Sequence, residues 1–124
     1  MKLITKVYNR KDDRGTFTEC INDDQCWKSI NSGTMNAGAI MGNHYHKNCK
    51  AFFFLLSGSA SIYIKNVRDQ NSKIVNFLLN SDEGVIFEPY ETHAIKYEED
   101  SKFLFLKSEK FDKENSDLNE AKLI

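Results

Sequence analysis

A short apolar run, Phe52–Leu56, is the feature that most constrains the fold of this chain. It is too short for an ordinary buried helix and ends at the turn residues Ser57-Gly58, so it predicts a β-strand buried on both faces. The next segment, Ser59–Lys65, alternates apolar and polar residues from Ala60 onward. This period of two predicts a half-buried antiparallel strand.

The rest of the chain also contains short strand-like runs, which predicts an all-β domain. Further strand-like runs, separated by polar turns at intervals typical of sandwiches and barrels, are Leu3–Tyr8, Thr16–Cys20, Ile74–Leu79, Val85–Phe87 and Phe103–Leu106. With 124 residues, the chain is expected to form one domain with a single core, 1–124. We expect the apolar runs 52–54 and 103–105 to lie one in each sheet. The polar tail, 110–124, is expected to form a short helix or to fray.

Composition excludes several classes of function. The net charge of −1 suggests no nucleic-acid partner. No apolar run approaches a membrane span, and the start of the chain lacks a signal-peptide core, so we expect a cytoplasmic protein without a membrane partner. The three cysteines, Cys20, Cys26 and Cys49, are an odd number without CxxC spacing and are read as free thiols.

The histidines are the first candidates for chemistry. His44 and His46 lie two residues apart, so in an extended strand both side chains point to the same face, while Tyr45 points away. His93, the remaining histidine, follows a turn at Pro89. An imidazole with an ordinary pKa of about 6.5 can remove a proton at neutral pH.

A second candidate stretch is Asp13–Glu19. Arg14 beside Gly15 offers a planar donor fork that suits phosphate oxygens, and Phe17 could stack on a base near Glu19. Taken alone, this stretch favours a turn that carries a surface ion pair.

The two motifs together resemble the cupin superfamily, which consists of small jelly-roll β-barrels. The residues that carry the resemblance are Gly42, His44, His46, Gly58, Gly84, Pro89 and His93. In metal-binding cupins, two histidines and a glutamate of the first motif join a histidine of the second around a divalent ion. Here Ala51 stands where that glutamate would fall, seven residues before Gly58. Two alternatives stay open: His44, His46 and His93 hold zinc, manganese, iron or nickel, or no metal is required.

The string Asp13-Arg14-Gly15-x-Phe17-x-Glu19 narrows the resemblance to cupins that act on nucleotide-linked sugars. These include 4-keto-6-deoxysugar 3,4-ketoisomerases, 3,5-epimerases and the cupin domain of reductases in capsular polysaccharide synthesis. The similarity runs from about residue 8 to about residue 112. It implies that Arg14, Phe17 and Glu19 bind the nucleotide diphosphate, often across a homodimer interface. His46 and Met41 stand where the 3,5-epimerases usually carry glutamine and arginine, so the other two groups fit better.

The expected chemistry is removal of a proton next to the ketone of a nucleotide-linked 4-keto-6-deoxy sugar, for capsule, lipopolysaccharide or glycan synthesis. By resemblance, His44 is the general base, and His46 orients it, moves the proton or polarises the ketone. His93 is expected from the facing sheet, near the substrate. A second imidazole, Lys50 or a metal could stabilise the enolate. Epimerisation and ketoisomerisation both remain open. The alternative functions are a metal-dependent isomerase or dioxygenase acting on another small molecule, and a non-catalytic cupin that binds a sugar or nucleotide.

Overall fold

The computed structural model describes residues 1–5 and 7–124, and its regular structure is entirely β-strand. The strands are β1 (Lys2–Thr5), β2 (Tyr8–Asp12), β3 (Gly15–Glu19), β4 (Ser29–Met35), β5 (Ile40–His46), β6 (Ala51–Ser57), β7 (Ser59–Asn66), β8 (Val75–Asn80), β9 (Glu83–Phe87), β10 (Glu91–Tyr97), β11 (Ser101–Lys107) and β12 (Leu118–Glu120). The run expected at Leu3–Tyr8 includes Lys6, which lies outside the described residues. The described part of the chain has no helix long and apolar enough to cross a membrane.

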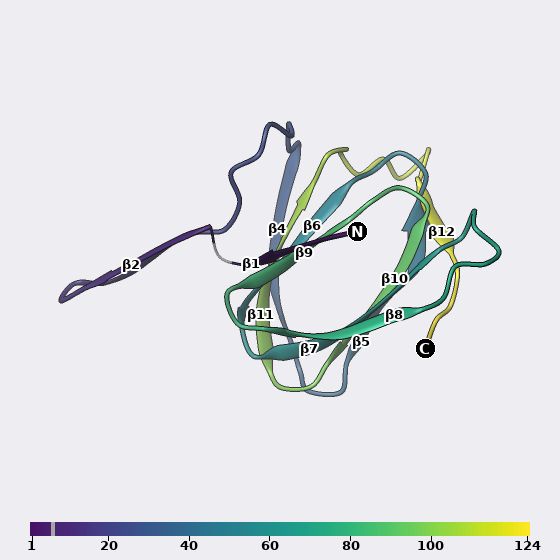
Figure 1. Cartoon of the computed structure of the whole chain (residues 1–124). Helices are drawn as coiled ribbons and strands as arrows, with labels where there is room; N and C mark the ends of the chain where they lie inside the picture. The colour runs from purple at the N-terminus through teal and green to yellow at the C-terminus, as the bar shows by residue number, and fades with distance from the viewer. Residues whose placement is uncertain (6) are drawn as a thin grey trace.

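Two antiparallel sheets face each other and enclose the core (Figure 1). One has the strand order β1-β9-β6-β11-β4, and the other has the order β12-β5-β10-β7-β8. Strands β2 and β3 form a separate hairpin that projects away from the barrel (Figure 1). This arrangement confirms the all-β jelly-roll fold.

The tail does not form the helix that we considered. Its residues 118–120 form strand β12 instead, which pairs with β5 at the edge of the second sheet. The physical reason is that β5 offers this segment an unpaired edge, whereas an isolated short polar helix has little to stabilise it.

Strand β6 is buried on both faces from Ala51 to Leu55, as its apolar run predicts, whereas Leu56 at the end of the run is 41% exposed. Phe53 and Leu55 are fully buried in the core between the sheets. Phe52 and Phe54 point to the outer face, where they pack in a second cluster with Trp27. Because the segment that carries Trp27 covers the outer face of the first sheet, β6 does not alternate apolar with polar residues.

Burial in the core confirms one further expectation, and strand pairing contradicts another. Ala60, Ile62 and Ile64 of β7 are buried as a set, which confirms the alternation. The expectation that the two apolar runs lie in different sheets is wrong, because β6 and β11 are hydrogen-bonded neighbours, with Phe53 opposite Phe105. The rings of Phe53, Phe103 and Phe105, all from this sheet, pack against one another in the core between the sheets.

Candidate active site

Strands β5 and β10 bring the three histidines together inside the barrel. His44 and His46 project from the same face of β5, and His93 lies directly opposite His44 in the register of β10. The ring centroids are 4.9 Å apart for His44 and His93, 5.2 Å for His44 and His46, and 6.4 Å for His46 and His93. The expectation that His93 comes from the facing sheet is wrong, because β10 is the hydrogen-bonded neighbour of β5.

A bulge next to Gly42 allows this close approach. The pairing of β5 with β10 shifts between His93 and Ala94, so that Asn43 has no partner in β10. Gly42 has a φ of +96°, and a Cβ atom there would lie 2.6 Å from the carbonyl oxygen of His93. Only glycine meets both conditions without strain. The glycine of the motif is therefore explained by backbone packing rather than by ligand contact.

The histidines line a cavity of about 230 Å³. Its apolar walls are Met41, Ala51, Ile95, Phe103, Phe105 and Leu118. Its polar groups are the three histidines, Asn31 and Lys107. A smaller hollow of about 170 Å³, roofed by the segment 109–118, shares His46, Lys107 and Leu118 with this cavity. The tail of the chain therefore lines a hollow that adjoins the histidine cavity.

His93 is held as a neutral imidazole. Its ring stacks on Phe87 at a centroid distance of 4.1 Å, and its Nδ1 lies 3.2 Å from the carbonyl oxygen of Glu91. A carbonyl oxygen only accepts, so Nδ1 carries the proton and Nε2 is left free to accept another. Burial, followed by the charge of His44, lowers the pKa of His93 to about 3.

His44 and His46 are also disposed to stay neutral. Burial lowers the pKa of His44, and the positive charge of Lys107 adds to this effect. Burial and the charge of His44 lower the pKa of His46, against the opposing pull of Asp117. At neutral pH the cluster therefore consists of neutral imidazoles, each with one ring nitrogen free to accept a proton, which is the state that a general base requires.

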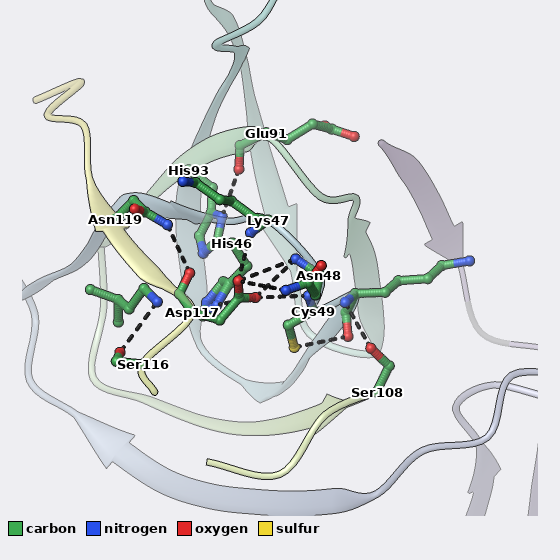
Figure 2. A network of polar contacts seen from close by, with 12 residues as sticks. His46, Lys47, Asn48, Cys49, Glu91, His93, Ser108, Ser116, Asp117 and Asn119 are labelled. Atoms are coloured by element: carbon green, nitrogen blue, oxygen red, sulfur yellow. Dashed lines mark hydrogen bonds and ion pairs between the residues drawn. The ribbon is translucent and has the colours of Figure 1, made fainter. Parts of the chain in front are cut away.

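Asp117 fixes the loop that follows β5 (Figure 2). Its carboxylate accepts hydrogen bonds from the backbone N–H groups of Lys47, Asn48 and Cys49 at 2.9–3.0 Å. Burial opposes the charged form, but these bonds outweigh it, so the pKa of Asp117 lies below its usual value. The same carboxylate lies 3.6 Å from the buried Nδ1 of His46, at ion-pair distance but too far for a hydrogen bond. Sequence reasoning missed Asp117 because its partners are about seventy residues away.

Replacing Asp117 with alanine is expected to destabilise the domain by about 1–3 kcal/mol, because it removes the acceptor of three backbone N–H groups, of which that of Cys49 is part-buried. Urea unfolding measures this change. Asp112→Ala is the matched control, since Asp112 caps only exposed amides within its own loop, and we expect it to change stability by less than about 0.5 kcal/mol. Equal effects of the two substitutions would contradict the role given to Asp117.

The residues predicted to bind the nucleotide lie away from the histidines. Arg14, Phe17 and Glu19 all belong to the β2–β3 hairpin, and none of them lines the histidine cavity. The Arg14 guanidinium forms an exposed ion pair with Asp12 at 2.7 Å, and Phe17 is 56% exposed. Within one chain, the structure therefore does not join the two predicted parts of the site.

The lysine that reaches the cavity is Lys107, whereas Lys50 does not line it. The Lys50 ammonium lies 3.5 Å from Glu88. Lys107 ends the run of alternate inward residues on β11, after Phe103 and Phe105. That period of two assigns Lys107 to the inward face of its strand, but its place in the cavity also depends on the pairing of β11 with β6.

The side chains present do not fit a bound metal. Ala51, which lines the cavity, contributes no carboxylate to it. Among the described residues, no group of three or more His, Cys, Asp or Glu side chains is arranged to hold a metal ion.

The fold and the site together define a cupin-type barrel with a histidine-lined cavity. A profile of the polysaccharide biosynthesis C-terminal domain family matches residues 10–119, which is most of the chain. The chain belongs to this family.

Solved structures confirm the resemblance to the nucleotide-sugar branch of the cupins. The capsular polysaccharide assembling protein CapF from Staphylococcus aureus is 26% identical, with a TM-score of 0.71 over 94% of this chain and 34% of that one. The QdtA 3,4-ketoisomerase from Thermoanaerobacterium thermosaccharolyticum, a double mutant in complex with TDP, is 26% identical, with a TM-score of 0.75 over 94% of this chain and 84% of that one.

A dTDP-4-dehydrorhamnose 3,5-epimerase from Sulfolobus tokodaii shares the fold at 20% identity, with a TM-score of 0.78 over 92% of this chain and 73% of that one. The chain spans about a third of the length of CapF. The search of curated protein sequences found no match. The family and the general reaction type of its relatives are thus defined, while the substrate of this chain is a matter for proposal.

Proposed function

We propose that this chain is an isomerase or epimerase of a nucleotide-linked 4-keto-6-deoxy sugar in surface polysaccharide biosynthesis. The observation that carries the proposal is the cluster of three neutral imidazoles facing an apolar cavity. Similarity to a ketoisomerase and to 3,5-epimerases, together with the family assignment, supports this reaction class.

The size of the cavity suits the sugar and leaves the nucleotide outside. At about 230 Å³ it is smaller than the roughly 300–1,000 Å³ of sites for drug-sized ligands. A hexose ring can therefore lie against the histidines, whereas the base and diphosphate need a second surface. The exposed Arg14 and Phe17 offer the donor fork and the aromatic face that such a group requires.

The mechanism begins with proton removal by His44. The ketone acidifies the hydrogens of the adjacent carbons, and a neutral imidazole accepts one of them. The electrons of the broken C–H bond form a C=C bond to the carbonyl carbon, and the carbonyl oxygen of the sugar becomes an enolate oxygen. His46 and His93 keep His44 oriented and exchange the proton with it. Protonation of the same carbon from the opposite face epimerises it, whereas protonation of the neighbouring carbon through an enediol moves the ketone.

The projecting hairpin leads us to propose a homodimer as the working form. Within the described part of the chain, β2 and β3 pair only with each other, and Phe17 and Tyr8 leave half or more of their surface exposed. A second copy of the chain can cover these aromatic side chains. In this arrangement, Arg14, Phe17 and Glu19 of one subunit complete the nucleotide site of its partner.

Arg14→Ala is expected to weaken nucleotide-sugar binding by about 10- to 150-fold, because a hydrogen bond to a charged group contributes about 1.5–3 kcal/mol. The turnover number at saturation should change little. Isothermal titration calorimetry and steady-state kinetics measure the two effects. Lys11→Ala, on the same hairpin and also exposed, is the matched control and should bind normally.

Mixing the Arg14→Ala and His44→Gln variants tests the shared site. If each site takes its hairpin from the partner subunit, mixed dimers contain one intact site and regain activity that neither variant has alone at low substrate concentration. No gain on mixing, with subunit exchange verified, would place both parts of the site in one chain.

Product analysis tests the proposed reaction class. We expect incubation with dTDP- or UDP-linked 4-keto-6-deoxyglucose to give either an inverted carbon or a displaced ketone, identified by NMR and mass spectrometry. Tight binding of a nucleotide without conversion would indicate a binding module instead. Indifference to every nucleotide would favour a cupin that acts on another small molecule.

A further inference from the structure

Lys107 is the only lysine or arginine among the described residues that lines the histidine cavity. It follows Phe103 and Phe105 on the inward face of β11, at the end of the strand. Its partner across the sheet is Ala51 on β6, whose methyl group leaves room beside it. A long cationic side chain therefore enters the cavity opposite one of the smallest residues of its wall.

The ammonium group of Lys107 is not neutralised within the described part of the chain. The ion pairs found among residues 1–5 and 7–124 do not include it. Its Nζ lies 5.8 Å from the ring centroid of Phe105. Burial is the main cause of the lowered pKa of each histidine, and the charge of Lys107 contributes to all three. This charge thus acts throughout the cavity.

The Lys107 ammonium, which lies beside neutral imidazoles in an apolar cavity, is suited to stabilise a substrate oxygen that gains negative charge. The attraction is stronger there than in water, because few solvent dipoles screen it. Each other polar group of the cavity is a histidine or the amide of Asn31, and none of these carries a full positive charge at neutral pH. Lys50, the lysine considered from the sequence, is held near Glu88 instead.

We propose that Lys107 is the electrophilic residue of this site: its ammonium polarises the ketone oxygen and holds the enolate formed when His44 removes the adjacent hydrogen. This inference rests on the proposed function. In the step, the C–H bond breaks, its proton goes to the imidazole and its electrons form the C=C bond, while the carbonyl electrons move to the oxygen beside Nζ. Reprotonation at carbon reverses the charge movement, and no oxidant or reductant is needed.

Replacing Lys107 with methionine keeps the length of the side chain and removes its charge. We expect kcat to fall by about 10²–10³-fold, the usual cost of losing one donor to an oxyanion, while KM stays within a few-fold. Lys107→Arg should recover part of kcat, because it restores the charge. Lys102→Met, on the same strand but exposed, is the matched control and should behave as the unmodified protein.

The infrared stretch of the bound ketone gives a direct readout of polarisation. With a ¹³C-labelled carbonyl bound to the turnover-deficient His44→Gln protein, we expect a lower frequency when Lys107 is present than when it is methionine. A normal kcat in Lys107→Met, or an unchanged carbonyl frequency, would overturn the inference while leaving the proposed function standing. Absence of any conversion by the unmodified protein would overturn both.

Discussion

Replacement of His44 by glutamine is expected to lower turnover by about 10²–10⁴-fold or more, the usual contribution of a general base. His44 touches both other histidines, and the lowered pKa of its imidazole keeps it ready to accept a proton at neutral pH. Glutamine fills a similar volume and can still hydrogen-bond, but it cannot take up the proton. Nucleotide-sugar affinity should therefore remain within a few-fold of the original.

Tyr45→Phe is the matched control for this substitution. Tyr45 lies on the opposite face of β5, where it stacks on Tyr90 at a centroid distance of 6.0 Å. Its hydroxyl does not line the cavity, so the loss of this group should leave turnover intact. An equal loss of binding and turnover in His44→Gln would indicate a structural role, and a large loss in Tyr45→Phe would show that the chemistry lies on the other face.

Acidification below about pH 6.5 is expected to destabilise the fold steeply, because His93 must be buried without its charge. Its folded pKa of about 3 lies below the ordinary value of 6.5, so between these two values the unfolded chain binds a proton that the folded chain excludes. Stability then falls as pH falls, by up to about 1.4 kcal/mol per pH unit for this histidine. His44 and His46 act in the same direction.

Urea unfolding between about pH 7.5 and about pH 5.5 measures this slope before most carboxylates titrate. His93→Gln, which cannot become charged, should show a clearly shallower dependence on pH than the unmodified protein. A flat profile in the unmodified protein, or the same slope in both, would mean that His93 is not held neutral by burial.

Much of the fold could be predicted from local patterns. The apolar run of β6 and the alternation of β7 report burial directly, and both were confirmed. Strands β4 and β10 were not anticipated as strands, because β4 is an edge strand rich in serine and glycine and β10 mixes apolar with polar residues. Their place in the sheets depends on partners far away in the chain, which periodicity does not reveal.

Some residues of the candidate site could likewise be predicted from local sequence patterns, whereas others depend on distant strand pairing. The spacing of His44 and His46 was sufficient to place both rings in one cavity, because they share a strand. Lys107 and Asp117 could not be placed without knowing that the end of β11 and the tail return to β5 and β6. Lys50 was the reasonable choice by nearness in sequence, but it precedes β6, does not line the cavity, and has its ammonium 3.5 Å from Glu88.

The measurement that tests the central claim most directly is proton NMR in deuterated water of this protein with a dTDP-linked 4-keto-6-deoxyhexose, repeated with His44→Gln. We predict that deuterium enters the carbon next to the ketone with the unmodified protein and enters far more slowly with the variant. Exchange at the same rate in both would contradict the role of His44. Failure of the unmodified protein to exchange with any nucleotide-linked ketosugar would contradict proton abstraction as its function.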